Sequence, residues 1–168
     1  MSPTRYMAVA YADEILVPAC IDTFAFKNGG AGTTLLLTDL EVYMGYTDNT
    51  NLGAVFLENY IAGTRQLVLQ ADSIYLTADE GTWCEFELDT PFTYYPEHHM
   101  LLEFCFTDGT TGMHNFIWTT ETSRSVISYS VEESQGYPAF NMIHLLLTGS
   151  ELSMSQETFG RVKIILGQ

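Results

Sequence analysis

Basic residues are scarce in this chain. Its 168 residues include six Lys and Arg against 21 Asp and Glu, which gives a formal net charge of −15 at neutral pH. A surface of this charge repels nucleic-acid phosphates and anionic lipid headgroups, so we expect no nucleic-acid partner. The excess of carboxylates also suits bound cations, a high-salt habitat or simply a well-solvated surface.

Cysteine is scarce as well. Cys20, Cys84 and Cys105 are the three cysteines, and no Cys-x-x-Cys pair occurs. Neither a zinc site nor a disulfide framework is therefore indicated. A bridge between Cys84 and Cys105 is geometrically feasible if their two strands pair as a hairpin, and buried free thiols are the alternative.

Long apolar runs are absent. No run reaches the roughly 18 residues that a membrane-spanning helix needs, so no membrane insertion is expected. The opening residues Met1 to Arg5 do not have the basic and apolar parts of a secretion signal. The chain is therefore either intracellular or numbered from a mature form.

Alternating apolar residues are abundant. The pattern is clearest from Trp83 to Phe106, where Cys84, Phe86 and Leu88 alternate with polar neighbours before a corner at Pro96. A period of two predicts half-buried strands. Hydrophobic residues make up 46% of the chain, which suits one domain with a sizeable core.

The same alternation, separated by turn residues, recurs along the whole chain. It predicts about ten short strands without a repeat period, which favours an all-β, two-sheet antiparallel β-sandwich. We expect it to be jelly-roll-like, with an extra C-terminal strand. Residues 1–150 form the sandwich, and 151–168 are a polar linker and terminal strand that belongs to the same domain or is exchanged with a neighbour. The predicted strands are 6–11, 21–26, 33–46, 67–76, 83–94, 100–106, 115–119, 125–131, 140–146 and 162–166, and 52–60 is a short helix or a loop over a sheet edge.

Residues Trp83 to Leu102 resemble a recurring β-sandwich module of bacterial secreted and cell-surface proteins. That pattern has a Trp, alternating apolar residues, Pro-Phe-x-Tyr and then a strand of Asn-Leu-Leu type, seen here as Pro91-Phe92-Thr93-Tyr94 and Leu101-Leu102. Blocks at Arg5, 13–15, 19–26, 42–47 and 141–147 are similar too. The resemblance covers about residues 5 to 148 and departs from the pattern at Tyr95 to His99.

The resemblance implies a jelly-roll-like domain of large exported proteins, with a role in adhesion or glycan contact and no catalytic site. It implies an extracellular or cell-surface location, with itself, surface proteins or glycans as partners. On this basis we expect a non-catalytic module of a cell surface or matrix.

A glycan site needs exposed aromatic faces for sugar C–H groups, with carboxylates or amides for the hydroxyls. The candidate residues are Trp118, Tyr94, Tyr95 and Asn115, with Asp108 nearby in sequence. The alternative is that the aromatic residues pack in the core.

Calcium is the one cofactor that the sequence suggests. Asp48, Asn49 and Asn51 place three oxygen-bearing side chains in one loop, and Asp79, Glu80 or Asp108 can add more. Calcium prefers six to eight such oxygen ligands. Asx-rich loops also cap their own turns, which is the alternative.

The sequence gives little evidence of a catalytic site. His98 and His99 are neighbours, so on a strand they point to opposite faces and do not share a metal. Glu85 and Glu87 lie on one strand face, but such pairs on an outward face are usually only solvated. We therefore expect no enzyme, and a secreted glycan-active enzyme is the remote alternative.

The terminal strand offers another function. Val162, Ile164 and Leu166 alternate with Arg161, Lys163 and Ile165 after a polar segment. Such a strand completes its own sheet or adds to the exposed edge of a neighbour, and repeated exchange builds a filament. A self-assembling extracellular filament subunit is therefore the second function that we expect.

Overall fold

Strands dominate the computed structural model, which describes residues 4–30, 33–109, 116–152 and 161–166. The described residues contain one short 3-10 helix, η1 (Leu57–Asn59). The strands are β1 (Thr4–Ala10), β2 (Ala19–Lys27), β3 (Thr33–Thr47), β4 (Gln66–Ala78), β5 (Trp83–Tyr94), β6 (His99–Phe106), β7 (Asp108–Gly109), β8 (Trp118–Ser128), β9 (Tyr137–Ile143), β10 (Leu145–Glu151) and β11 (Arg161–Leu166).

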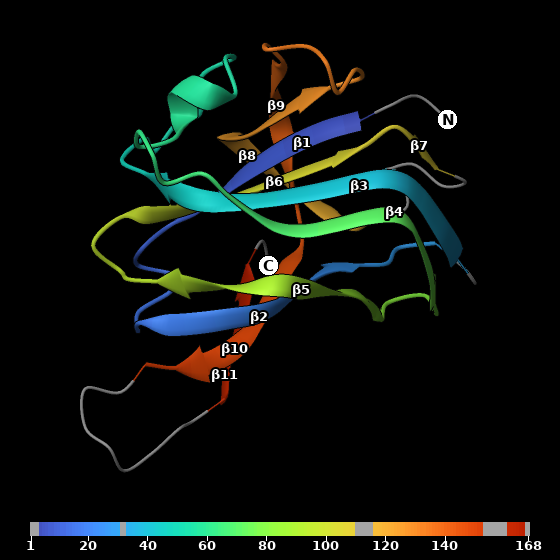
Figure 1. Ribbon diagram of the computed structural model, residues 1–168, viewed down its shortest axis with the longest axis horizontal. Coiled ribbons are helices and arrows are strands. Elements are labelled where there is room, and N and C mark those ends of the chain that lie inside the picture. The colour runs from blue at the N-terminus through green and yellow to red at the C-terminus, as the bar shows by residue number, and fades with distance from the viewer. Residues whose placement is uncertain (1–3, 31–32, 110–115, 153–160, 167–168) are drawn as a thin grey trace.

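Two antiparallel sheets face one another (Figure 1). The large sheet has the order β4-β3-β6-β1-β8-β9, with β7 paired to β3, and the small sheet has the order β11-β10-β2-β5. The chain passes between the sheets after β1, β2, β4, β5 and β9, as strands do in a jelly roll. The predicted all-β, two-sheet sandwich is confirmed.

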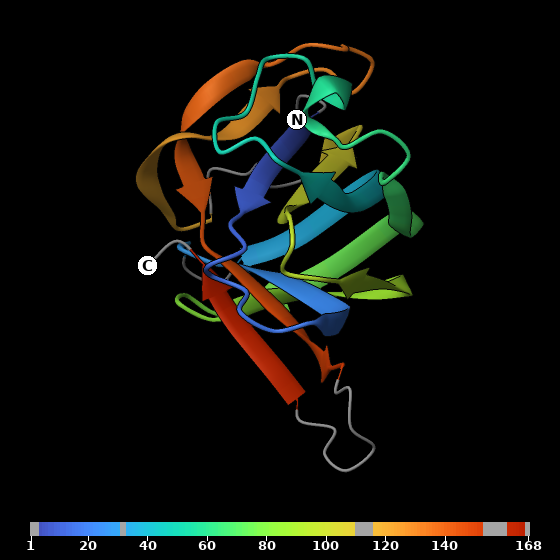
Figure 2. The ribbon, with the colours of Figure 1, turned by 90° about the vertical axis from the view of Figure 1, so that its left-hand side faces the viewer.

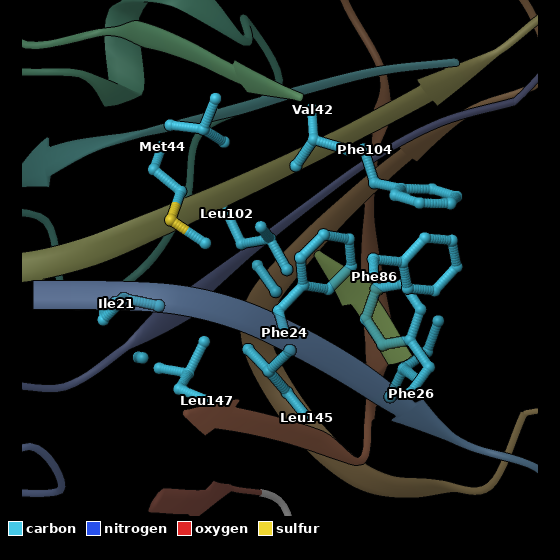
Figure 3. Packing of buried hydrophobic residues seen from close by; sticks show 14 of the residues in the cluster. Ile21, Phe24, Phe26, Val42, Met44, Phe86, Leu102, Phe104, Leu145 and Leu147 are labelled. Carbon is cyan, nitrogen blue, oxygen red and sulfur yellow. The ribbon is translucent and has the colours of Figure 1, made fainter. Parts of the chain in front are cut away.

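Phenylalanine side chains fill the space between the sheets. The Phe24 and Phe86 rings stack with centroids 4.7 Å apart, and Phe26 and Phe104 meet edge to face at 5.4 Å (Figure 3). These rings come from β2, β5 and β6, so they join the two sheets. Their positions follow the period-two alternation, because every second residue of a strand points to one face.

A second, smaller core lies on the other face of the large sheet. Met7 and Val9 of β1 pack there with residues of the loops above, and the cluster contains Met7, Val9, Leu52, Phe56, Leu101 and Val126. Figure 1 shows η1 and the β8–β9 turn on this side, away from the small sheet. Segment 52–60 therefore covers a sheet face rather than the sheet edge that the sequence suggested.

The hairpin premise for a disulfide was wrong. Cys84 on β5 is paired with Phe26 in the small sheet, whereas Cys105 on β6 is paired with Arg5 and Glu41 in the large sheet. The two strands meet at a corner between the sheets, so they do not form a ladder. All three cysteines are free thiols.

Two predicted strand divisions were also wrong. Residues 118–128 form one strand, β8, with an irregularity between Thr120 and Ser125, where Ser123 has a positive φ of 63°. Residues 140–146 are instead divided at His144, where the chain passes from the large sheet to the small one (Figure 2). There the His144 N–H donates to the Ile117 carbonyl, and its carbonyl accepts from the Lys27 N–H.

The terminal strand is present as predicted. β11 pairs antiparallel with β10 of the same chain, from Leu145↔Leu166 to Ser150↔Arg161 (Figure 2). It lies at the edge of the small sheet. Leu166 is buried in the main core, and Ile164 packs against it.

Candidate functional site

Tyr94 does not belong to a glycan-binding surface. It is 0% exposed, it packs in the main core, and its hydroxyl donates to the His98 carbonyl at 2.9 Å. Its position in the alternation of β5 places it inside, so the glycan-binding prediction for Tyr94 was wrong.

Tyr95 and Trp118 are exposed but lie near opposite ends of strand β2. Tyr95 follows Tyr94, which pairs with Ala19 at the start of β2. Trp118 follows Ile117, whose N–H donates to the Lys27 carbonyl at the end of β2. A strand of nine residues spans roughly 30 Å, so one sugar does not contact both. Asn115 lies outside the described residues.

In the loop that contains Asp48, polar groups bond other groups of the protein. The Asp48 carboxylate lies 2.6 Å from Nδ1 of His98, and the Asn49 N–H donates to the Thr47 hydroxyl. Asp79 follows β4 at the far end of the β3–β4 ladder, and Asp108 pairs with Thr38 in the middle of β3. Neither residue reaches Asp48. No group of three or more His, Cys, Asp or Glu side chains suited to a metal occurs among the described residues.

The most tightly organised polar cluster was missed by the sequence-based reasoning. Glu103 on β6 is 0% exposed and lies between two arginines on the outer face of the large sheet. Nε of Arg5 donates to its Oε1 at 2.7 Å, and Nε of Arg65 donates to its Oε2 at 2.9 Å. The Tyr60 hydroxyl adds a bond of 2.9 Å to Oε2. We call Arg5, Tyr60, Arg65 and Glu103 the Glu103 cluster.

Electrostatics keep this carboxylate charged. Burial alone would raise the pKa of Glu103, but the hydrogen bonds and charges of Arg65 and Arg5 outweigh burial and hold it below the usual value. Burial, together with the neighbouring Glu103 charge, raises the pKa of Tyr60 well above its ordinary value. Glu103 is therefore an anion that accepts bonds from a protonated tyrosine and two cations.

The Glu103 cluster fastens two loops to the sheet. Nη1 of Arg5 donates to the Glu133 carbonyl in the β8–β9 turn, and the Arg5 guanidinium stacks over the Phe56 ring at 4.2 Å. The guanidinium of Arg65 lies 3.3 Å from the Tyr43 ring centroid. The sequence feature that could have revealed this cluster is a charged residue within the apolar run of β6, because a buried charge needs partners.

A second ionic clamp holds the β1–β2 connection. Both Nη atoms of Arg124 bond the two carboxylate oxygens of Glu14, at 3.0 and 2.6 Å, and Nη2 also donates to the Val9 carbonyl. The guanidinium lies 4.1 Å from the Tyr11 ring centroid. Such two-pronged pairing sets orientation as well as distance.

A shallow hollow opens on the β8–β9 turn. It has a volume of about 320 Å³ and is lined by Glu133, Ser134, Gln135, Gly136 and Tyr137. Tyr137, the first residue of β9, is 70% exposed, and Tyr129, at the other end of the turn, is 57% exposed. A glycine is required at 136, because an added Cβ would lie 2.7 Å from the Ile127 carbonyl oxygen and 2.8 Å from the Phe56 ring.

Comparison with protein-family models, with curated proteins and with solved structures found no match to this chain. The family resemblance of residues 5–148 therefore stays a prediction. In the part of the chain that the structure describes, no helix is long and apolar enough to cross a membrane.

Proposed function

We propose that this protein is a non-catalytic β-sandwich module that serves in adhesion or structure at a cell surface or in an extracellular matrix. The observation that carries the proposal is the use of the buried charges. Glu103, Arg5 and Arg65 bond one another and hold loops against the large sheet. This arrangement supports a stiff scaffold that works through its surface.

The acidic surface supports the same proposal. A net charge of −15 on 168 residues limits self-association and nonspecific binding to anionic polymers. Contacts to partners then depend on local features of the surface, such as an open sheet edge or the β8–β9 turn.

Attachment of the folded protein to cells tests this role. Beads coated with the full chain should bind to the surface of the cells that produce it, whereas beads coated with heat-unfolded chain should not. Equal binding by both coatings, or by neither, would argue against an adhesive role for the folded domain.

The second candidate function is a filament subunit that exchanges β11 between copies. Three observations favour it: β11 is an edge strand, its Leu166 inserts into the core, and the nine residues Leu152 to Gly160 separate it from its partner strand. Ordinary hairpin loops have two to five residues, so this connection is long enough to let β11 leave its own sheet.

A cysteine pair distinguishes docking within one chain from exchange. Thr148 and Lys163 lie directly opposite on β10 and β11. Opposite strand positions have the Cα separation that a disulfide needs. In a Cys20→Ser background, T148C/K163C should give a covalent ladder on non-reducing gels if β11 is exchanged. A monomer band alone would reject the filament.

Calcium binding at Asp48, Asn49 and Asn51 is proposed as an accessory property. Calcium should raise the melting temperature of the wild type but not of Asp48→Asn, because a ligand that binds only the folded state stabilises it. An equal response from both proteins, or none from either, would reject the site.

A further inference from the structure

We infer that the hollow on the β8–β9 turn binds a neutral carbohydrate, with Tyr137 as the face on which a sugar ring stacks. The inference rests on the proposed surface role and names the ligand class that this surface takes. The predicted glycan residues are not part of it.

The lining has the composition that sugars require. The exposed Tyr137 ring offers an apolar face for sugar C–H groups and a hydroxyl at its edge. Glu133, Ser134 and Gln135 add a carboxylate, a hydroxyl and an amide in the same hollow. A volume of about 320 Å³ falls at the lower end of small-molecule sites, roughly 300 to 1,000 Å³, which suits one or two rings.

The hollow is held in shape before a ligand arrives. Arg5 of the Glu103 cluster donates to the Glu133 carbonyl, the Phe56 N–H donates to the Ser134 carbonyl, and the Gly136 N–H donates to the Ala54 carbonyl. The Ser128 hydroxyl also donates to the Glu133 carboxylate at 2.8 Å. A preorganised site loses less conformational entropy on binding, which matters for weakly binding sugars.

Charge selects a neutral ligand. Residues Tyr129 to Tyr137 contain Glu132 and Glu133 but neither Lys nor Arg, and Arg5, which contacts the turn from β1, is buried and paired with Glu103. The turn therefore repels uronates, sulfates and phosphates. A quaternary ammonium ion prefers a cage of several aromatic rings. Among the residues that line this hollow, Tyr137 is the one aromatic ring.

Calorimetric titration of the full chain tests the site. The probes are hexasaccharides of glucose, xylose, mannose and N-acetylglucosamine, with oligogalacturonate as the acidic probe and choline as the cationic one. We expect at least one neutral hexasaccharide to bind, and oligogalacturonate and choline not to bind. Tyr137→Ala should weaken binding about tenfold, the equivalent of one lost ring contact.

Tyr75→Ala is the matched control, because Tyr75 is 65% exposed and lies on β4, in a different part of the large sheet. It should bind like the wild type, and Gln135→Ala should weaken binding. Tyr137 is largely exposed, so its removal should leave the melting temperature unchanged.

Equal affinity of Tyr137→Ala and wild type would place any sugar site elsewhere and overturn the inference, as would a preference for oligogalacturonate or choline. Absence of binding to every neutral probe at millimolar concentration would also overturn it. Cell attachment of the coated beads is measured without these sugars, so its result judges the surface role separately.

Discussion

Glu103 shows how one residue organises a face of the large sheet. A carboxylate at this position in β6 brings together Arg5 from β1, Arg65 from the segment before β4, and Tyr60 after η1. Its neighbours in sequence are apolar, so alternation alone assigns the position to a strand but gives it no role. Partners 38 to 98 residues away cannot be inferred from the local pattern.

Removal of this carboxylate should be severe. Glu103→Ala leaves two arginines, one of them nearly buried, without their counter-charge, and we expect it to lower the free energy of unfolding by about 3–5 kcal/mol. Urea unfolding measures the change. The control Glu85→Ala, on the exposed face of β5, should change it by less than about 0.5 kcal/mol. Equal effects would contradict the role of the Glu103 cluster.

The stability of the wild type should also depend on pH through Glu103. Its pKa is lowered in the folded state, so the stabilisation is complete above the unfolded-state pKa of about 4.3 and is lost as pH falls through the lower folded-state value. The stability difference between wild type and Glu103→Gln should therefore shrink as the pH falls below about 4. A constant difference between pH 6 and pH 2 would show that Glu103 is not held as an anion.

At the scale of elements, alternation predicted most strands but not their partners. The runs of β2, β5 and β6 are read correctly from the sequence because each buries every second residue. The sheet to which a strand belongs depends on turns and corners, which the local alternation does not reveal. The alternation therefore did not show that Cys84 and Cys105 lie in different sheets. β1 is buried on both faces because loops cover the face that points away from the small sheet. These loops come from distant parts of the chain, so the sequence around β1 does not predict this burial.

The docking of β11 predicts a contrast between neighbouring residues. Leu166 is 2% exposed in the main core, whereas Ile165 beside it is 41% exposed. Leu166→Ala should lower the free energy of unfolding by about 2–5 kcal/mol, and Ile165→Ala by less than about 1 kcal/mol. Chemical denaturation of the two variants measures this. Equal losses would mean that β11 does not dock with this face inward.

The β2–β10 ladder depends on a glycine. At Gly149, next to the irregularity in the ladder, an added Cβ would overlap the Cys20 carbonyl oxygen, which belongs to the backbone and has little room to move. Gly149→Ala should therefore destabilise the fold by at least about 2 kcal/mol, measured by thermal unfolding. Gly53→Ala, where the nearest atom is 3.7 Å away, is the control and should have little effect. A silent Gly149→Ala would contradict the close approach of these strands.

At the scale of the whole molecule, charge sets the behaviour in solution. A net charge of −15 makes the folded chain repel itself, and salt screens this repulsion over about 10 Å at 0.1 M. We expect the melting temperature to rise by a few degrees between low salt and 0.5 M NaCl. A fall over this range would show that attractive surface ion pairs outweigh the repulsion.

The overall fold could be predicted from the sequence better than the features of the surface could. The sandwich follows from alternation, which is local, whereas the hollow beside Tyr137 depends on the Arg5 and Phe56 contacts that hold the turn in place. Tyr94 illustrates the limit, because an aromatic residue near a corner has the same local pattern whether it faces solvent or the core. Composition alone does not decide between these positions.

The central claim is that this domain works at the outside of the cell. An antibody against the folded domain, applied to intact cells that produce the protein, tests it most directly. We predict labelling before permeabilisation, and its loss after brief protease treatment of the intact cells. Labelling that appears only after permeabilisation would contradict the account.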